Sequence, residues 1–217
     1  MAINKRNSSL WVKIVVVFVV LAFVASLVPA FFLGGSGPQP TNASTETGAT
    51  LERIANDHVP AVASSTAALQ ADPEDYNALV NLGNVYYDWG LQIMQALGSG
   101  TGHDLPMWTA AVSSYERALA IEPGDPNVEV DMAIAYFYSG QTPRAIEVAE
   151  QVMAESPEFA PAYYNGAIFY RASGQTADAV AALERYLELE PEGQSASAAY
   201  NMLAEMQAES AETTTQP

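Results

Sequence analysis

Residues 136–157 read YFYSGQTPRAIEVAEQVMAESP, and residues 170–191 read YRASGQTADAVAALERYLELEP. The second stretch begins thirty-four positions after the first, and the two share Tyr, Gly-Gln-Thr, Ala and Pro in the same register. Pro123 lies one further step of this size before Pro157, whereas the step from Pro73 to Pro123 is fifty positions. A fixed period of this length indicates a structural repeat whose copies stack on one another.

The chemistry of the turns indicates that each repeat is a pair of antiparallel helices. Gly140 and Gly174 are suited to the left-handed conformation that ends a helix, and Thr142 and Thr176 are expected to N-cap the helix that follows. Asp125-Pro126 is a further cap followed by a proline in the first helical turn. Small residues recur where paired helices would approach closely, at Gly83, Ala133 and Ala167.

The interval from Pro73 to Pro123 exceeds the period by sixteen positions, and the excess falls between the two helices of the first unit. Tyr76–Leu97 is predicted to be one helix, and the next helix is expected to begin near Met107 or Trp108. The glycines of residues 98–106 lack the spacing of a phosphate-binding loop. We therefore expect a mobile connector that folding does not require.

These residues resemble the tetratricopeptide repeat family, whose unit reads W-x2-L-G-x2-Y, then A-x3-F, then P. Matching positions include Leu82-Gly83-x2-Tyr86 in the first unit and Gly166-Ala167-x2-Tyr170 in the third. No unit has the Trp, and Glu129 stands where the pattern has a large apolar residue. The resemblance implies an all-α solenoid of about three helix-turn-helix units with flanking helices, in a domain spanning residues 51–207.

An apolar run over residues 14–33 contains no charge and would extend about 30 Å as a helix, the thickness of a bilayer core. Lys5, Arg6 and Lys13 precede it, which predicts that residues 1–13 are cytoplasmic and that the repeats lie outside the cytoplasm. A cleaved signal peptide is the alternative, because small residues surround Pro29. Residues 34–50 and 208–217 are expected to be a flexible tether and a disordered tail, since they are poor in large apolar residues.

Charge and composition restrict the kinds of partner. The 217 residues carry a formal charge of −17, and the part beyond residue 33 has five arginines against all 25 acidic residues, which is −20. Such a surface repels nucleic acid. The negative charge keeps the protein soluble, attracts basic partners, or does both. With no cysteine, two distant histidines and no catalytic motif, we expect no catalytic residue, no cofactor and no metal site.

In this family the partner lies in an inner groove formed by the first helix of each unit. The groove positions predicted here are Asn77, Val80, Asn84, Tyr87, Asp88, Asn127, Val130, Ile134, Phe137, Tyr138, Tyr164, Ile168 and Arg171. Their apolar and aromatic character favours a peptide or amphipathic helix as the occupant, with Tyr138 and Tyr164 as anchors. The alternative is that these side chains pack against one another or against the chain's own tails.

The subtype of the family that clamps a C-terminal carboxylate uses Lys or Arg with Asn. Asn84 matches, but Val80 replaces a Lys, and Arg171 is the only cation among these positions. No clamp of that kind is expected. The sequence thus indicates a membrane-anchored, extracytoplasmic adaptor for a protein or peptide segment, which would assist envelope protein assembly or maturation. The alternatives are a self-associating structural subunit of an envelope complex, hence a homo-oligomer, and a cytochrome c maturation factor.

Overall fold

The structure is a computed structural model that describes residues 42–215, and it describes side chains for residues 44–209. All regular elements in this range are α-helices, as the repeat pattern predicts. They are α2 (Asn42–Ala71), α3 (Tyr76–Leu97), α4 (Leu105–Ile121), α5 (Pro126–Tyr138), α6 (Thr142–Glu155), α7 (Ala160–Ala172), α8 (Thr176–Leu189) and α9 (Ala196–Thr215).

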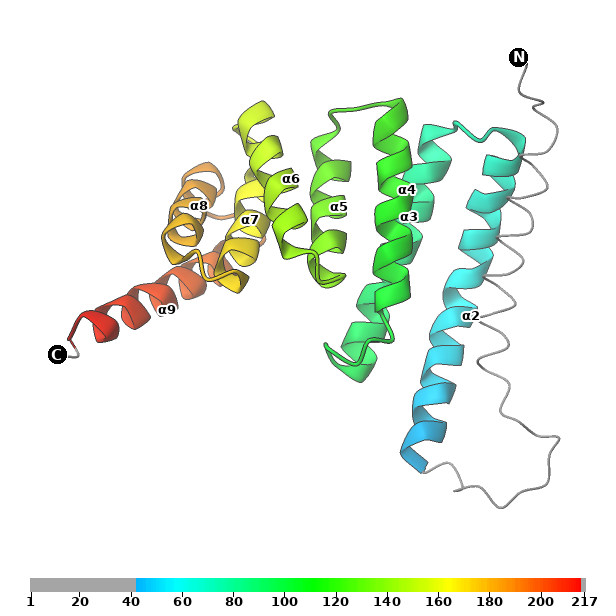
Figure 1. The fold of residues 1–217 in the computed structure, drawn as a ribbon, viewed down its shortest axis with the longest axis horizontal. Coiled ribbons are helices and arrows are strands. Elements are labelled where there is room, and N and C mark those ends of the chain that lie inside the picture. Colours follow the sequence, from blue (N-terminus) through cyan, green and yellow to red (C-terminus); the bar gives the residue numbers. More distant parts are fainter. Residues whose placement is uncertain (1–41, 216–217) are drawn as a thin grey trace, which may run out of the picture. The chain divides into compact units, whose positions relative to one another are not determined.

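Helices α3 to α9 each pack against the next helix along the chain (Figure 1). The pairs α3/α4, α5/α6 and α7/α8 are the three predicted units, and α5 also contacts α7. The first helices of the second and third units, α5 and α7, therefore meet. Between residues 42 and 215 no helix is both long enough and apolar enough to cross a membrane. The predicted span, residues 14–33, and the cytoplasmic segment, residues 1–13, lie outside the described residues.

Two predicted boundaries are wrong. The tether predicted to continue to residue 50 ends earlier, because α2 begins at Asn42, and the tail predicted from residue 208 is helical as far as Thr215. The physical reason is that helix propagation costs far less than nucleation. Each helix is anchored by buried residues, Ile54 in α2 and Met206 in α9, and extends beyond them.

The turns between helices follow the predicted glycines but not the predicted caps. Gly140 and Gly174 have φ angles of 82° and 78°, in the left-handed region. The prediction that Thr142 and Thr176 are N-caps is wrong, because each is the first residue of its helix. The preceding glutamines hold the cap positions and make no side-chain cap bond, because each side chain instead donates to a serine hydroxyl two residues earlier. The Asp125 cap is confirmed: its carboxylate accepts from the backbone N–H of Asn127 at 3.0 Å.

The small residues lie where the paired helices touch. A Cβ atom placed on Gly83 would overlap the ring of Tyr115 from α4. The equivalent residues Ala133 and Ala167 are fully buried. Beside them, the hydroxyls of Tyr136 and Tyr170 donate to Glu116 and Glu150, each on the second helix of the preceding pair, so the same bond recurs one period apart.

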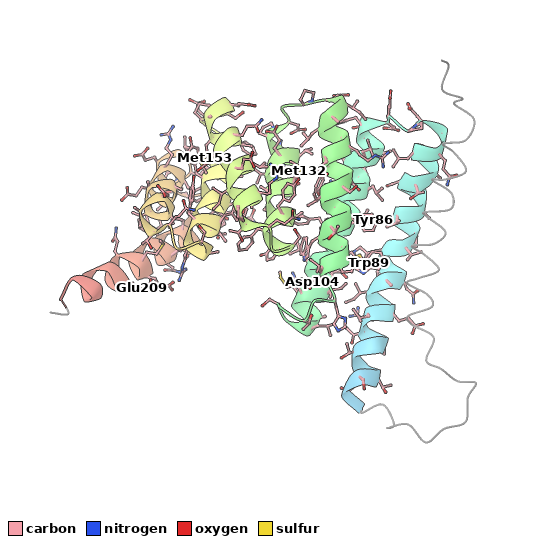
Figure 2. The ribbon with its side chains drawn as sticks, in the orientation of Figure 1. Tyr86, Trp89, Asp104, Met132, Met153 and Glu209 are labelled. Carbon is pink, nitrogen blue, oxygen red and sulfur yellow. The ribbon has the colours of Figure 1, made fainter. Side chains whose placement is uncertain are left out.

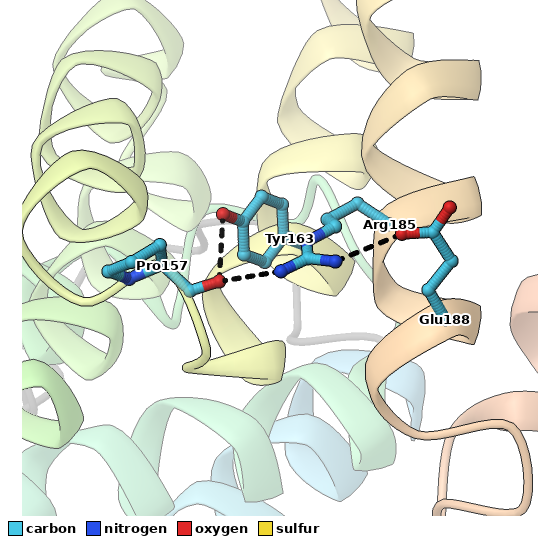
Figure 3. Close-up of polar contacts among 4 residues, drawn as sticks. All are labelled: Pro157, Tyr163, Arg185 and Glu188. Atoms are coloured by element: carbon cyan, nitrogen blue, oxygen red, sulfur yellow. Dashed lines mark hydrogen bonds and ion pairs between the residues drawn. The ribbon is translucent and has the colours of Figure 1, made fainter.

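A further set of hydrogen bonds joins the third unit to the loop before it (Figure 3). The carbonyl of Pro157 accepts from the Tyr163 hydroxyl at 3.2 Å and from the Arg185 guanidinium at 3.4 Å, and Arg185 also pairs with Glu188 at 2.9 Å. One period earlier, the positions of Tyr163 and Arg185 hold Glu129 and Gln151. Glu129 is 7% exposed, and burial raises the pKa of its carboxyl, with repulsion from Glu155 adding to the effect.

The inserted residues lengthen the helices of the first unit and build a separate small core. Ile54 of α2, Trp89 and Ile93 of α3, and Met107 of α4 are buried together there. The ring of His58 stacks on Trp89 with centroids 5.5 Å apart, and its Nδ1 lies 2.9 Å from the carbonyl oxygen of Ile54. This cluster holds α2 against the repeats.

The loop after α3 is shorter than predicted. Helix α4 begins at Leu105, slightly before the expected start at Met107 or Trp108, because Asp104 closes its first turn. The carboxylate of Asp104 accepts from the indole N–H of the fully buried Trp108 at 2.9 Å, and Asp104 itself is only 7% exposed. Figure 2 shows Trp89 and Asp104 in the part of the molecule that the insertion extends. The expectation that residues 98–106 are all dispensable is therefore wrong for Asp104.

Replacing Asp104 by Ala should lower the melting temperature of the purified full chain by about 4–8 °C. The loss leaves the buried Trp108 N–H without a partner, at a cost of about 2 kcal/mol. Thermal unfolding followed by circular dichroism measures the change. As controls, Asp104→Asn keeps an acceptor oxygen, and replacing residues 99–103 with Gly-Ser removes only exposed backbone, so both should change the melting temperature by less than about 2 °C. A shortened loop that destabilises as much as Asp104→Ala would contradict this assignment.

Candidate functional site

The first helices α3, α5 and α7 carry the predicted groove residues, and their shared side is called the inner face below. Six of those residues are exposed, six are partly buried and one is buried. The exposed residues are Asn77, Asn84, Asp88, Asn127, Tyr138 and Arg171; the partly buried ones are Val80, Tyr87, Ile134, Phe137, Tyr164 and Ile168; the buried one is Val130. Most of the apolar members pack on the core behind them, so the accessible surface is more polar than predicted.

The aromatic residues have intramolecular partners as well as exposed surface. Tyr138 stacks on the buried Trp108 with ring centroids 4.8 Å apart, and Tyr138 remains 38% exposed. Tyr164 packs against Tyr186 at 5.2 Å, and Phe137 against Phe169 at 5.0 Å. The rings therefore pack against other aromatic rings of the protein, and the two tyrosines retain surface for a partner.

A hollow of about 250 Å³ opens between α5 and α7 on the inner face. It is lined by Asn127, Val130, Asp131, Ile134, Phe159, Pro161 and Asn165. Three of these residues, Asn127, Val130 and Ile134, are among the predicted groove positions. The structure brings the remaining predicted residues to the same set of helices but not to this hollow.

Asp131 is the charged group of the hollow. Burial is the main cause that raises the pKa of its carboxyl to about 6, and the charges of Asp125 and Asp88 act in the same direction. The Asp131 charge in turn contributes to the raised pKa values of Tyr87 and Tyr115, after their own burial. Within residues 44–209, no hydrogen bond stabilises the ionised carboxylate. Holding this negative charge in the folded protein is thus costly.

The inner face has no arginine available for an acidic ligand within residues 44–209. Arg171 pairs with Glu205 of α9 at 3.2 Å, so the one cation predicted in the groove is neutralised. Asn84, the residue that matched the carboxylate clamp, accepts at 2.8 Å from the hydroxyl of Tyr115. A terminal carboxylate would have to compete with Glu205 for Arg171, and the Tyr115 bond occupies only the carbonyl oxygen of the Asn84 amide.

Sequence reasoning missed Asp131, Phe159 and Asn165. A usable signal was present, because Asp131 and Asn165 are separated by one period of the repeat. A polar residue recurring at one repeat position indicates an accessible site on that helix. In the portion of the chain with described side chains, no group of three or more His, Asp or Glu residues is arranged to hold a metal ion.

Comparison with known proteins supports the repeat assignment. A tetratricopeptide repeat family model matches residues 136–206. The tetratricopeptide repeat domain of Sgt2 from Aspergillus fumigatus is 23% identical over 62% of this chain and 84% of its own, with a TM-score of 0.50, which shows a shared fold. The first such domain of Spaghetti (RPAP3), solved with an HSP90 peptide, is 20% identical over 61% of this chain and 95% of its own, with a TM-score of 0.47. No curated protein sequence matches.

Asp131→Asn should stabilise the full chain at pH 7.5 and less so at pH 5. Because the folded-state pKa of Asp131 lies above its ordinary value, folding favours the protonated acid. The penalty for ionisation is therefore absent below about pH 4, grows as pH rises, and is complete above about pH 6. After solvent screening, about 1 kcal/mol of this penalty remains, so Asp131→Asn should raise the melting temperature at pH 7.5 by about 2–4 °C. Thermal unfolding at the two pH values measures the gain; an equal gain at both would exclude Asp131 ionisation as its cause.

Proposed function

We propose that this protein is a membrane-anchored adaptor that holds a segment of another protein on the inner face of its repeats and performs no catalysis itself. The observation that carries the proposal is the hollow between α5 and α7, which lies among the predicted groove residues. A hollow of about 250 Å³ on the side of a helix groove is large enough to receive one side chain of a bound segment.

A peptide segment suits this surface better than a small molecule. The amide side chains of Asn127 and Asn165 line the hollow, and amides both donate to and accept from a peptide backbone. Beyond the hollow, Tyr138 and Tyr164 offer aromatic surface on the same two helices. Aromatic anchors contribute much of the binding energy because they bury a large area with few rotatable bonds.

The membrane anchor and the extracytoplasmic location of the repeats are inferred from sequence. The support is the uncharged run of residues 14–33, preceded by Lys5, Arg6 and Lys13 and followed by a segment in which Arg53 is the first basic residue. Assistance to envelope protein assembly or maturation is the role that such a placement favours.

The double variant Tyr138→Ala/Tyr164→Ala should reduce capture of the partner by the intact protein at least tenfold. Affinity capture from detergent-solubilised membranes, quantified by mass spectrometry, measures the loss. Tyr200→Ala is the matched control, because Tyr200 is 52% exposed on α9 and not part of the inner face. Circular dichroism must show that the double variant keeps its helices, since Tyr138 also covers Trp108. Capture unchanged in the double variant would place the binding surface elsewhere, and recovery of only the chain itself would favour the self-associating subunit.

Alkaline phosphatase fused after residue 217 should be active in bacterial cells, since that enzyme requires an extracytoplasmic location. The fusion should also stay with the membrane after carbonate washing. Mass spectrometry of the purified protein distinguishes an anchor, which keeps residues 14–33, from a cleaved signal peptide, which leaves Phe31 as the first residue. An inactive fusion would overturn the proposed topology.

A further inference from the structure

We propose that the hollow between α5 and α7 receives a basic side chain, Lys or Arg, of the bound segment, and that the carboxylate of Asp131 pairs with its cation. The inference rests on the proposed function, because it names the chemistry of the segment that the adaptor binds. It makes the inner face selective for basic segments.

The lining of the hollow matches the two parts of such a side chain. Apolar walls and polar groups are both present: Val130, Ile134, Phe159 and Pro161 are apolar, and Asp131, Asn127 and Asn165 are polar. Lys and Arg have a long aliphatic stem that packs on apolar surface and a charged end that needs polar partners. An apolar ligand would leave the Asp131 carboxylate covered and unpaired, which is costly.

The electrostatics of the inner face point to a cation rather than an anion. Asp131 lies within the influence of two further carboxylates, Asp88 on α3 and Asp125 before α5, and it acts in turn on the phenols of Tyr87 and Tyr115. Arg171, the inner-face arginine, is already paired with Glu205. An acidic segment would meet repulsion without a compensating cation.

The negative charge of Asp131 is unfavourable in the folded protein. Among the described side chains no hydrogen bond supports the carboxylate, and neighbouring acids oppose its ionisation. Asn165 holds the equivalent position one unit later, so a neutral residue of similar size is compatible with this helix packing. A bound cation would remove the penalty, whereas a metal ion would lack the further carboxylate or histidine ligands it needs within residues 44–209.

A random dodecapeptide library selected on the purified full-length protein in detergent tests the inference. Wild type should enrich peptides with Lys or Arg at one fixed position among apolar and aromatic residues. Asp131→Asn should enrich the same apolar pattern without the basic residue. Glu184→Gln is the matched control, because it removes one exposed negative charge from α8 and should behave as wild type.

The binding of one selected peptide and of its Lys→Gln version to wild type and to Asp131→Asn is then measured by fluorescence anisotropy. The four affinities give the coupling between the peptide Lys and Asp131. The peptide change should weaken binding to wild type about tenfold and to Asp131→Asn less than twofold, as expected for a charge pair across an interface. Peptides without a basic preference, or with the same preference in Asp131→Asn, would overturn the inference and leave the groove function standing. Failure of any peptide to bind, or binding unaffected by Tyr138→Ala/Tyr164→Ala, would overturn the proposed function itself.

Discussion

Close contact between the two helices of each unit is the constraint on which the rest of the structure depends. A Cβ atom on Gly83 would overlap the ring of Tyr115, and Ala133 and Ala167 are fully buried at the equivalent positions, so little room is left there for larger side chains. Because these contacts repeat at one position of every unit, the first helices all present the same side, and neighbouring ones such as α5 and α7 meet. The inner face, its hollow and the recurring tyrosine–glutamate bonds follow from that geometry.

The helix pairs could be predicted from sequence because the period and the glycine turns are local features. The predicted bounds of Tyr76–Leu97 are confirmed, since Asp75 caps the start of that helix and Gly98 ends it. The predictions that failed concern side-chain burial and side-chain partners, which the period of the repeat does not determine. Val130 and Phe137 were placed on the correct helix, but how deeply each side chain packs depends on the neighbouring helix. Asp104 was missed because its role depends on the indole of Trp108, which only the folded helix brings within reach.

The inner face combines rigid surroundings with one unfavourable charge. Tyr138 and Tyr164 are held by rings behind them, so little rotational freedom is lost when a ligand covers them. Asp131, by contrast, reduces the stability of the fold at neutral pH. Residues that lower stability without serving the packing are typical of functional positions. The apolar lining expected from sequence is therefore better described as a polar surface with aromatic edges.

The buried Glu129 has a consequence for the motions of the chain. Tyr163 and Arg185 donate to the loop before the third unit, whereas the second unit has Glu129 and Gln151 at these positions. The backbone of Gly124 donates to the Glu129 carboxylate, yet burial still raises the pKa of that carboxyl. In a linear array of repeats, each unit contributes its own share of the cooperativity, and a unit that carries an unfavourable buried carboxylate opens more readily. Amide hydrogens of α5 should therefore exchange with solvent through partial openings that leave α7 and α8 intact. Since α5 also forms one wall of the hollow, the same openings would set how quickly a bound segment escapes.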